Sequence, residues 1–308
     1  MAKAALGPII GATITSADVD KASAPYAKDL AYKVLDRGTI GAHQATVWAC
    51  PAQAGARFLV MGPASGERQF IRFVEVPPVP GYRAMTTYGW HSLEITVEDV
   101  DAIPPKLKGS QFKIIGDPHD LGVGSNASAP KGSLIRAMQV VGLAEDVLYL
   151  TQIPTDGRRP HLPNAKTFID RIFIVPLGSP NMDRTRDWYI EKFANVEKGV
   201  EARGFALKLL NDALGVPADT KTSICTVKFP GQTLIEIDDY PPAAKPRPRH
   251  VNSLPPGIAT ISFAVDSLDR VGLPFVAPPR VVAEGPHRGK RVGVVVGSAT
   301  ELLELVQE

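Results

Sequence analysis

Charged side chains stand inside short alternating segments of the chain, where they could act on a small molecule. Glu236 lies within residues 233–238, and Glu304 lies within residues 302–306. The side chains of a strand point alternately to its two faces, so every second residue of each segment can face a cavity. A carboxylate in a dry cleft has a raised pKa and can act as a general base. A guanidinium near it, such as that of Arg171, could stabilise a developing enolate.

Four segments of the chain begin with one pattern, an alternating strand that runs into a short acidic turn. They are residues 10–20, 91–101, 170–177 and 259–269, and the first two end almost identically in Thr-x-x-Asp-Val-Asp. Each segment is followed by a helix or a short remnant of one, and then by further strands. A repeat of this kind is typical of a chain built from copies of one unit. We therefore predict four βαβββ modules.

The predicted helices of the modules alternate in length. Helical spacing predicts full helices over residues 19–35 and 181–193, whereas prolines break the stretches 103–107 and 271–274. This long-short-long-short order, with linker composition over residues 155–166, predicts two domains. Residues 1–155 would hold paired modules one and two, and residues 156–308 would hold paired modules three and four. The predicted fold class is α+β, with the four modules paired into two half-barrel domains.

Three segments carry a resemblance to a known family. They are Phe168-Ile-Asp-Arg-Ile-Phe-Ile-Val-Pro-Leu, followed by a helix with Trp188 and Tyr189, then residues 257–269, and the closing Glu301-Leu-Leu-Glu-Leu-Val-Gln. In these segments the chain resembles the vicinal-oxygen-chelate superfamily, which includes glyoxalase I, extradiol dioxygenases and bleomycin-resistance proteins. The resemblance implies glyoxalase-like half-barrels, in which paired sheets curve round a cleft. It also implies that histidine and glutamate side chains of the opening and closing strands hold a divalent metal.

The resemblance indicates which side chains should line the two clefts. Aligned on the acidic turns, the family's histidine position falls on Gly11, Ser92, Arg171 and Thr260, and its glutamate position falls on Arg72, Tyr149, Glu236 and Glu304. None of the histidine positions holds a histidine, so we assign no metal ligands. A divalent metal bound by carboxylates alone stays open as a cofactor. His91 is kept in reserve, because a shift of one residue would turn it inward.

These positions lead to a prediction of metal-free chemistry in the second cleft. Glu304 would be the base, Glu236 its partner, and Arg171 the group that stabilises an anion. The residues expected to contact substrate in the two clefts are Thr260, Ser262, Arg72, Glu94, Tyr149, Ser92 and His91. For any single one of the charged residues, an Arg–Glu ion pair that only fills the barrel is an equal alternative.

Three functions remain open at this point. The leading one is a lyase- or isomerase-type enzyme that abstracts a proton from a small oxygenated organic molecule. The second is an extradiol-type ring-cleaving dioxygenase, and the third is a non-catalytic protein that binds a small molecule and confers resistance. The polar residues at predicted cleft positions favour the first function.

Composition restricts the partners and the compartment. The 308 residues carry a net charge of +2, which gives no electrostatic footprint for nucleic acid or an acidic membrane surface. No apolar run approaches the roughly 20 residues that span a bilayer, and the N-terminus lacks the apolar region of a secretory signal. Cys50 and Cys225 are far apart, as suits a reducing compartment. We expect a cytoplasmic protein with a small-molecule substrate and, as its sheets allow, a homodimer.

Overall fold

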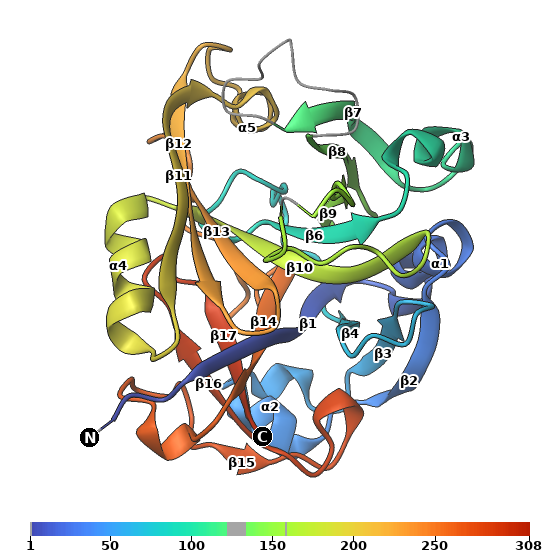
Figure 1. Cartoon of the computed structure of the whole chain (residues 1–308). Helices are drawn as coiled ribbons and strands as arrows, with labels where there is room; N and C mark the ends of the chain where they lie inside the picture. The colour runs from blue at the N-terminus through green and yellow to red at the C-terminus, as the bar shows by residue number, and fades with distance from the viewer. Residues whose placement is uncertain (1, 122–133, 158) are drawn as a thin grey trace.

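The computed structural model describes residues 2–121, 134–157 and 159–308, whose strands form two curled sheets (Figure 1). The first sheet, in the lower half of Figure 1, has eight strands in these ranges, in the order β15-β16-β17-β14-β1-β4-β3-β2. It is built from both ends of the chain. Its strands are β1 (Leu6–Ser16), β2 (Lys33–Thr39), β3 (Arg57–Gly62), β4 (Phe70–Glu75), β14 (Gly257–Val265), β15 (Arg280–Val281), β16 (Arg291–Val296) and β17 (Leu302–Gln307).

The second sheet is built from the middle of the chain. Over the described ranges it has nine strands, eight of them in the order β11-β12-β13-β10-β6-β9-β8-β7, and β5 pairs with β10 beside this path. Its strands are β5 (Gly89–Trp90), β6 (Ser92–Val97), β7 (Lys113–Leu121), β8 (Ile135–Val141), β9 (Val147–Gln152), β10 (Ile169–Ser179), β11 (Glu197–Ala206), β12 (Lys221–Phe229) and β13 (Thr233–Asp239).

The helices are short, and each of the longer two begins after a residue whose side chain caps it. The side chain of Asp18 accepts a hydrogen bond from the backbone of Lys21 at 3.0 Å, and Asn181 caps its helix in the same way. The first helix ends earlier than predicted because Ala31 takes a left-handed φ of 57° and the chain turns into β2. The helices are α1 (Val19–Asp29), α2 (Ala42–Val47), α3 (Ile103–Lys106), α4 (Met182–Lys192) and α5 (Lys208–Leu214), with single 3₁₀ turns at Pro51–Gln53, Val100–Ala102, Leu268–Arg270 and Gly285–His287.

Each quarter of the chain forms a βαβββ module, as predicted, but the sheets do not follow the predicted pairing. β1 pairs antiparallel with β14, so module one joins module four. β6 pairs antiparallel with β10, so module two joins module three. Each sheet therefore contains strands from both sides of the predicted boundary between residues 155 and 156, so this boundary does not separate two domains.

The course of the connections explains this nested pairing. β9 runs parallel to β6, and its last residue, Gln152, lies opposite Val97. β10 begins at Ile169, which faces Val97 from the other side of β6. β9 and β10 therefore flank β6 and run in opposite directions, so that the consecutive modules two and three share one sheet. The connections 76–88 and 240–256 instead lead from one sheet to the other. A parallel bridge between Thr87 and Lys245 joins these two connections.

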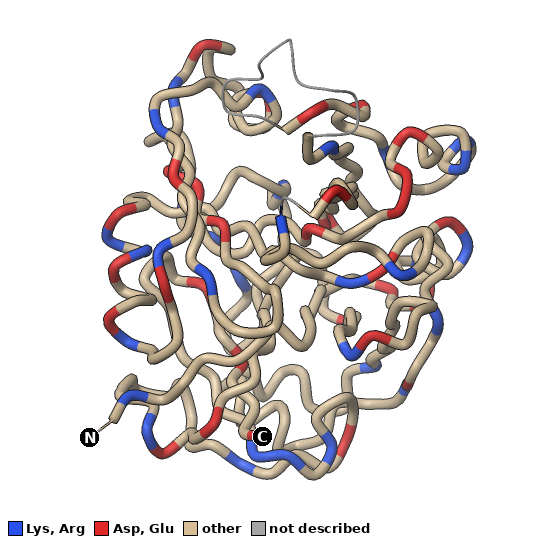
Figure 2. The backbone as a smooth tube through the Cα atoms, viewed as in Figure 1, with Lys and Arg blue, Asp and Glu red and all other residues tan. Residues whose placement is uncertain are grey.

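One apolar cluster joins the two sheets and both longer helices. It contains Phe263 of the first sheet, Val175 of the second, Tyr26 of α1 and Tyr189 of α4, all of them buried. Acidic and basic residues are interspersed along α4 (Figure 2). None of the helices in the described ranges is long and apolar enough to cross a membrane.

The nested pairing predicts how fragments of the protein behave. Residues 1–155 expressed alone lack β14 and β10. One edge of β1 and one edge of β6 are then unpaired, and the fragment contains only about half of the strands of each sheet. We expect fragments 1–155 and 156–308 to be unfolded or aggregated separately and to form a folded complex when they are co-expressed. Size-exclusion chromatography measures whether the fragments associate, and the chemical-shift dispersion of their NMR spectra shows whether they are folded. Cooperative unfolding of isolated 1–155 would contradict the pairing.

Candidate functional site

The concave face of the first sheet holds a carboxylate with many partners. Glu304 of β17 is fully buried and accepts hydrogen bonds at 2.8 and 3.0 Å from the Arg72 guanidinium of β4. Ser262 donates to it at 2.5 Å. It also contacts Trp48 Nε1 at 2.8 Å, Gln44 Nε2 at 3.0 Å and His287 Nε2 at 3.1 Å. Burial alone would raise the pKa of Glu304, but Arg72 and His287 hold it well below its ordinary value.

Apolar side chains fill the rest of this face. Trp48 follows α2 directly, and the Arg72 guanidinium stacks over its ring at 4.7 Å. Trp48 belongs to a buried cluster with Phe70 of β4 and Val294 of β16. A carboxylate whose pKa is held low and whose oxygens already accept hydrogen bonds is a poor proton acceptor. The expected role of Glu304 as a base is therefore not supported, and Arg72 and Glu304 form the ion pair that fills the barrel.

The concave face of the second sheet carries three carboxylates, Glu94 of β6 with Glu236 and Asp238 of β13, here called the carboxylate cluster. Strand register places them on one face, because Glu94 lies opposite Ile174 of β10, and the next positions of β10 along this face lie opposite Glu236 and Asp238. The apolar residues between them, such as Ile237, point to the core on the other side.

His91 joins the carboxylate cluster although the sequence pattern favours the opposite face. The chain is irregular between β5 and β6, and the His91 backbone N–H donates to the carbonyl of Pro176 at 3.1 Å. Its ring Nε2 lies 2.9 Å from Asp238 Oδ2, and its Nδ1 lies 3.1 Å from the Ser92 hydroxyl. The ring also packs against Tyr240, with centroids 5.5 Å apart. This break supplies the one-residue shift that would turn His91 inward.

Two members of the carboxylate cluster hold a proton more readily than ordinary glutamates. Burial raises the pKa of Glu94 to about 7, opposed by a hydrogen bond from Thr151 at 2.6 Å and assisted by Asp238. Burial, then Asp238 and Glu94, raise the pKa of Glu236 well above its ordinary value. Among the described residues, no Lys or Arg forms an ion pair with any of the three carboxylates. The cluster can therefore exchange protons in the neutral range.

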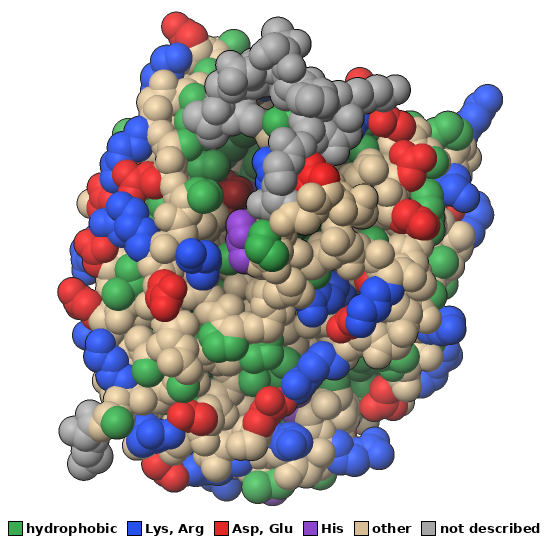
Figure 3. Space-filling view, viewed as in Figure 1, with side chains coloured by type: hydrophobic (Ala, Val, Ile, Leu, Met, Phe, Trp, Pro, Cys, Tyr) green, Lys and Arg blue, Asp and Glu red, His purple; other side chains and the backbone are tan. Residues whose placement is uncertain are grey.

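Solvent reaches the carboxylate cluster from one side. Glu236 and Tyr149 are partly exposed, although both lie in the middle of their strands. In the space-filling view, hydrophobic side chains border a recess beside the β11–β12 hairpin, and an acidic side chain is visible inside it (Figure 3). Two buried apolar groups, one around Leu210 and Met85 and one around Phe173, lie on this half of the molecule. Apolar walls with a few polar groups are typical of a small-molecule site.

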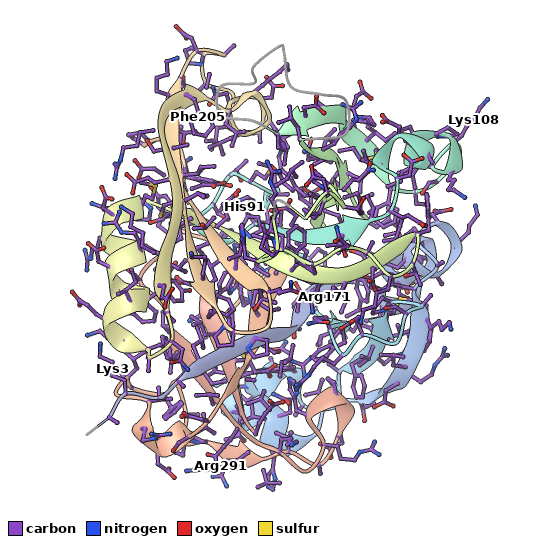
Figure 4. The ribbon with its side chains drawn as sticks, in the orientation of Figure 1. Lys3, His91, Lys108, Arg171, Phe205 and Arg291 are labelled. Atoms are coloured by element: carbon purple, nitrogen blue, oxygen red, sulfur yellow. The ribbon has the colours of Figure 1, made fainter. Side chains whose placement is uncertain are left out.

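Arg171 does not belong to either group. Its guanidinium donates to the backbone carbonyls of Gly231 and Gln232 at 2.9 and 3.2 Å, and it lies 3.7 Å from Glu67 of module one. The pairing of β10 with β6 shifts register twice between Ile169 and Ile174, so alternation counted from the acidic turn fails there. Figure 4 shows Arg171 along β10 toward the first sheet, whereas His91 lies by the second sheet.

The predicted site residues thus fall into two groups, but the members of each group differ from those of the two predicted clefts, because the modules pair differently. Arg72, Thr260, Ser262 and Glu304 lie together on the first sheet, and Ser92, His91, Glu94, Tyr149 and Glu236 lie on the second. Sequence analysis does not single out Tyr240 or Thr151. Tyr240 follows β13 directly, and its ring fits closely over Gly178, where an added Cβ would come within 2.8 Å of it. In the sequence, the only sign of this contact is the glycine at position 178, which leaves room for the ring.

The residues do not fit the metal site that the fold implies. Within the described residues, no group of three or more His, Cys, Asp or Glu side chains is arranged to hold a metal ion. On the first sheet, the Arg72 guanidinium places a positive charge where a cation would bind Glu304. On the second sheet, Asp238 is bound to His91 and Glu94 to Thr151. We therefore derive no catalytic step through a metal.

The raised pKa of Glu94 predicts how stability depends on pH. The native state keeps this proton to a higher pH than the unfolded chain, so Glu94 lowers the free energy of unfolding as pH rises from 4.5 to about 7. Glu94→Gln removes this titration and keeps an acceptor for Thr151. We expect the variant to be more stable than wild type above pH 7, by up to about 3 kcal/mol. Urea denaturation across pH measures it, and an equal decline in both proteins would contradict the raised pKa.

The ion pair of the first sheet predicts a large loss of stability without loss of the second site. Arg72→Met leaves the Glu304 carboxylate buried without its guanidinium, which costs about 3–5 kcal/mol. The double variant Arg72→Met/Glu304→Gln should recover much of this loss, because no charge is then left buried. Denaturant unfolding of the three proteins measures both effects. A loss under about 1 kcal/mol in the single variant would argue against the pair's role.

Comparison with known proteins identifies solved structures that share the fold of this chain. No protein-family model matches the sequence, and no curated protein sequence matches it. The structure of glyoxalase I from Zea mays aligns with 97% of this chain and 92% of its own, at 13% identity and a TM-score of 0.62. A candidate dioxygenase from Bacillus subtilis aligns with 98% of this chain and 86% of its own, at 11% identity and a TM-score of 0.60. The chain therefore has the fold of these two structures, two curled sheets built from paired modules, as the resemblance implied.

Proposed function

We propose that the chain is a glyoxalase-fold enzyme that abstracts a proton beside a carbonyl group of a small oxygenated molecule, in a lyase- or isomerase-type reaction. The carboxylate cluster supports this proposal. The buried Glu94 and the partly exposed Glu236 both have a raised pKa, and no Lys or Arg among the described residues forms an ion pair with either of them. Structural ion pairs, by contrast, hold their carboxylates ionised, as Arg72 holds Glu304.

The partly exposed Glu236 is the proposed base, in place of Glu304. It takes the proton from the substrate carbon, and the electron pair of the broken C–H bond moves into the carbonyl to form an enolate. In an isomerase-type reaction the deprotonated carbon carries a hydroxyl group, whose proton passes to the former carbonyl oxygen, and Glu236 returns its own proton to the former carbonyl carbon. In a lyase-type reaction the carbonyl re-forms, a C=C bond forms to the next carbon, and the leaving group on that carbon departs with its bonding electron pair. Burial, and then Asp238 and Glu94, keep the pKa of Glu236 raised, so that it holds an abstracted proton more readily than an ordinary glutamate does.

Neighbouring polar groups complete the proposed chemistry. Among the described residues, the buried Tyr240 hydroxyl has no hydrogen-bond partner, so it is free to donate to the enolate oxygen. His91 holds Asp238 through its Nε2. In this proposal the Tyr240 hydroxyl has the role that was expected of Arg171, the stabilisation of the anion. The dioxygenase alternative needs two imidazoles and a carboxylate, and in the described chain His91 is the histidine that contacts the cluster.

Exchange of carbon-bound hydrogen for deuterium tests this proposal without knowledge of the natural substrate. Hydroxyacetone and pyruvate are incubated with the full chain in D₂O, and ¹H NMR follows the loss of their C–H signals. We expect the protein to accelerate the exchange and the rate to rise with pH through the neutral range, as the bases ionise. Glu236→Gln should slow it at least about 100-fold.

The matched control is Glu98→Gln, which changes an exposed glutamate just after β6. This variant should exchange at the wild-type rate. Equal rates in Glu236→Gln and Glu98→Gln, or no acceleration by the wild-type protein, would overturn the proposed function. Saturable binding of either ketone without exchange would favour the non-catalytic alternative.

A further inference from the structure

A separate pocket lies where the connection 240–256 passes over the ends of β14 and β17. Its volume is about 240 Å³, slightly below the range of about 300–1,000 Å³ that is usual for ligand sites. Trp90, Pro246, Pro255 and Val296 give it mainly apolar walls. None of the residues that line it belongs to the carboxylate cluster. The pocket therefore has room for a molecule of about one ring.

Arg247 supplies a fixed guanidinium to this pocket. Its Nε donates to the Thr87 hydroxyl at 3.1 Å, its Nη1 to the carbonyl of Ile258 at 2.8 Å, and its Nη2 to the carbonyl of Trp90. A guanidinium has five N–H donors, and these three bonds use three of them. The three bonds hold the side chain in place before any ligand arrives, which reduces the entropy lost on binding.

The charge around the pocket is positive. Arg249 also lines it, and in the part of the chain that the structure describes neither arginine forms an ion pair. Glu301 lines the pocket as well, but its carboxyl oxygens accept from the Tyr189 hydroxyl at 2.6 Å and the Ala299 backbone at 2.8 Å. Burial raises the pKa of Glu301 to about 7, so its negative charge is incomplete at neutral pH.

We propose that this pocket binds a small organic anion, a carboxylate carried on a flat apolar ring. The two guanidiniums meet the carboxylate, since their planar donor pairs match its two oxygens. Trp90 and the prolines pack against the ring. This site is independent of the proton chemistry at Glu236, and it can be present whether or not that chemistry is confirmed.

Benzoate and benzamide are the probes for this site, because they share a ring and differ in charge. Isothermal titration of the full chain should show saturable binding of benzoate and much weaker binding of benzamide. Arg249→Gln should lower the affinity for benzoate at least about tenfold, which is the loss expected for one hydrogen bond between charged groups. Arg280→Gln changes an exposed arginine on β15 and is the matched control, which should bind like wild type.

Two further variants test whether benzoate binds in this pocket or at the carboxylate cluster. Val296→Trp, at an exposed wall position, should fill the pocket and abolish benzoate binding without unfolding the protein. Glu236→Gln should leave benzoate binding unchanged. Absence of saturable benzoate binding, equal affinity in Arg249→Gln and Arg280→Gln, or loss of binding in Glu236→Gln would overturn the proposal.

Discussion

Antiparallel pairing between opening strands is the constraint on which both concave faces depend. β1 meets β14 and β6 meets β10, and the closing strand of each module lies parallel to its opening strand. Side chains from distant modules are thereby brought onto one surface. Arg72 reaches Glu304 because module one joins module four, and Glu94 approaches Glu236 because module two joins module three. A different pairing of the same modules would combine these groups differently and give other chemistry.

The two faces show how one partner decides the state of a buried glutamate. Glu304 and Glu236 both lie within the closing strands of their modules, and Arg72 and Tyr149 lie within the closing strands of the modules that pair with them. With a guanidinium opposite, the glutamate stays ionised and the barrel is packed shut with Trp48. With a phenol opposite and Asp238 beside it, the glutamate keeps a proton far more readily. One sheet is thus made a structural element, and the other is left suited to proton transfer.

Much of this could be predicted from sequence, because alternation and acidic turns are local signals. The four modules follow from them, and so do the inward positions of Arg72, Glu94, Tyr149, Glu236 and Glu304. The prediction for Arg171 is wrong because the pairing of β10 with β6 changes register twice, so alternate positions counted from the acidic turn no longer lie on one face. His91 turns inward because the chain breaks between β5 and β6. Which opening strands meet is a non-local property, and no short segment encodes it.

The nested order of the modules also shapes how the protein can fold while it is being made. Gly11 of β1 pairs with Ser262 of β14, about 250 residues later, which corresponds to roughly 10–50 seconds of translation. The inner pair of modules can close its sheet on the nascent chain first. During that interval the first module must wait on the ribosome with an open strand edge. Such an edge invites aggregation, so the cell's chaperones would have most to protect in the earliest quarter of the polypeptide.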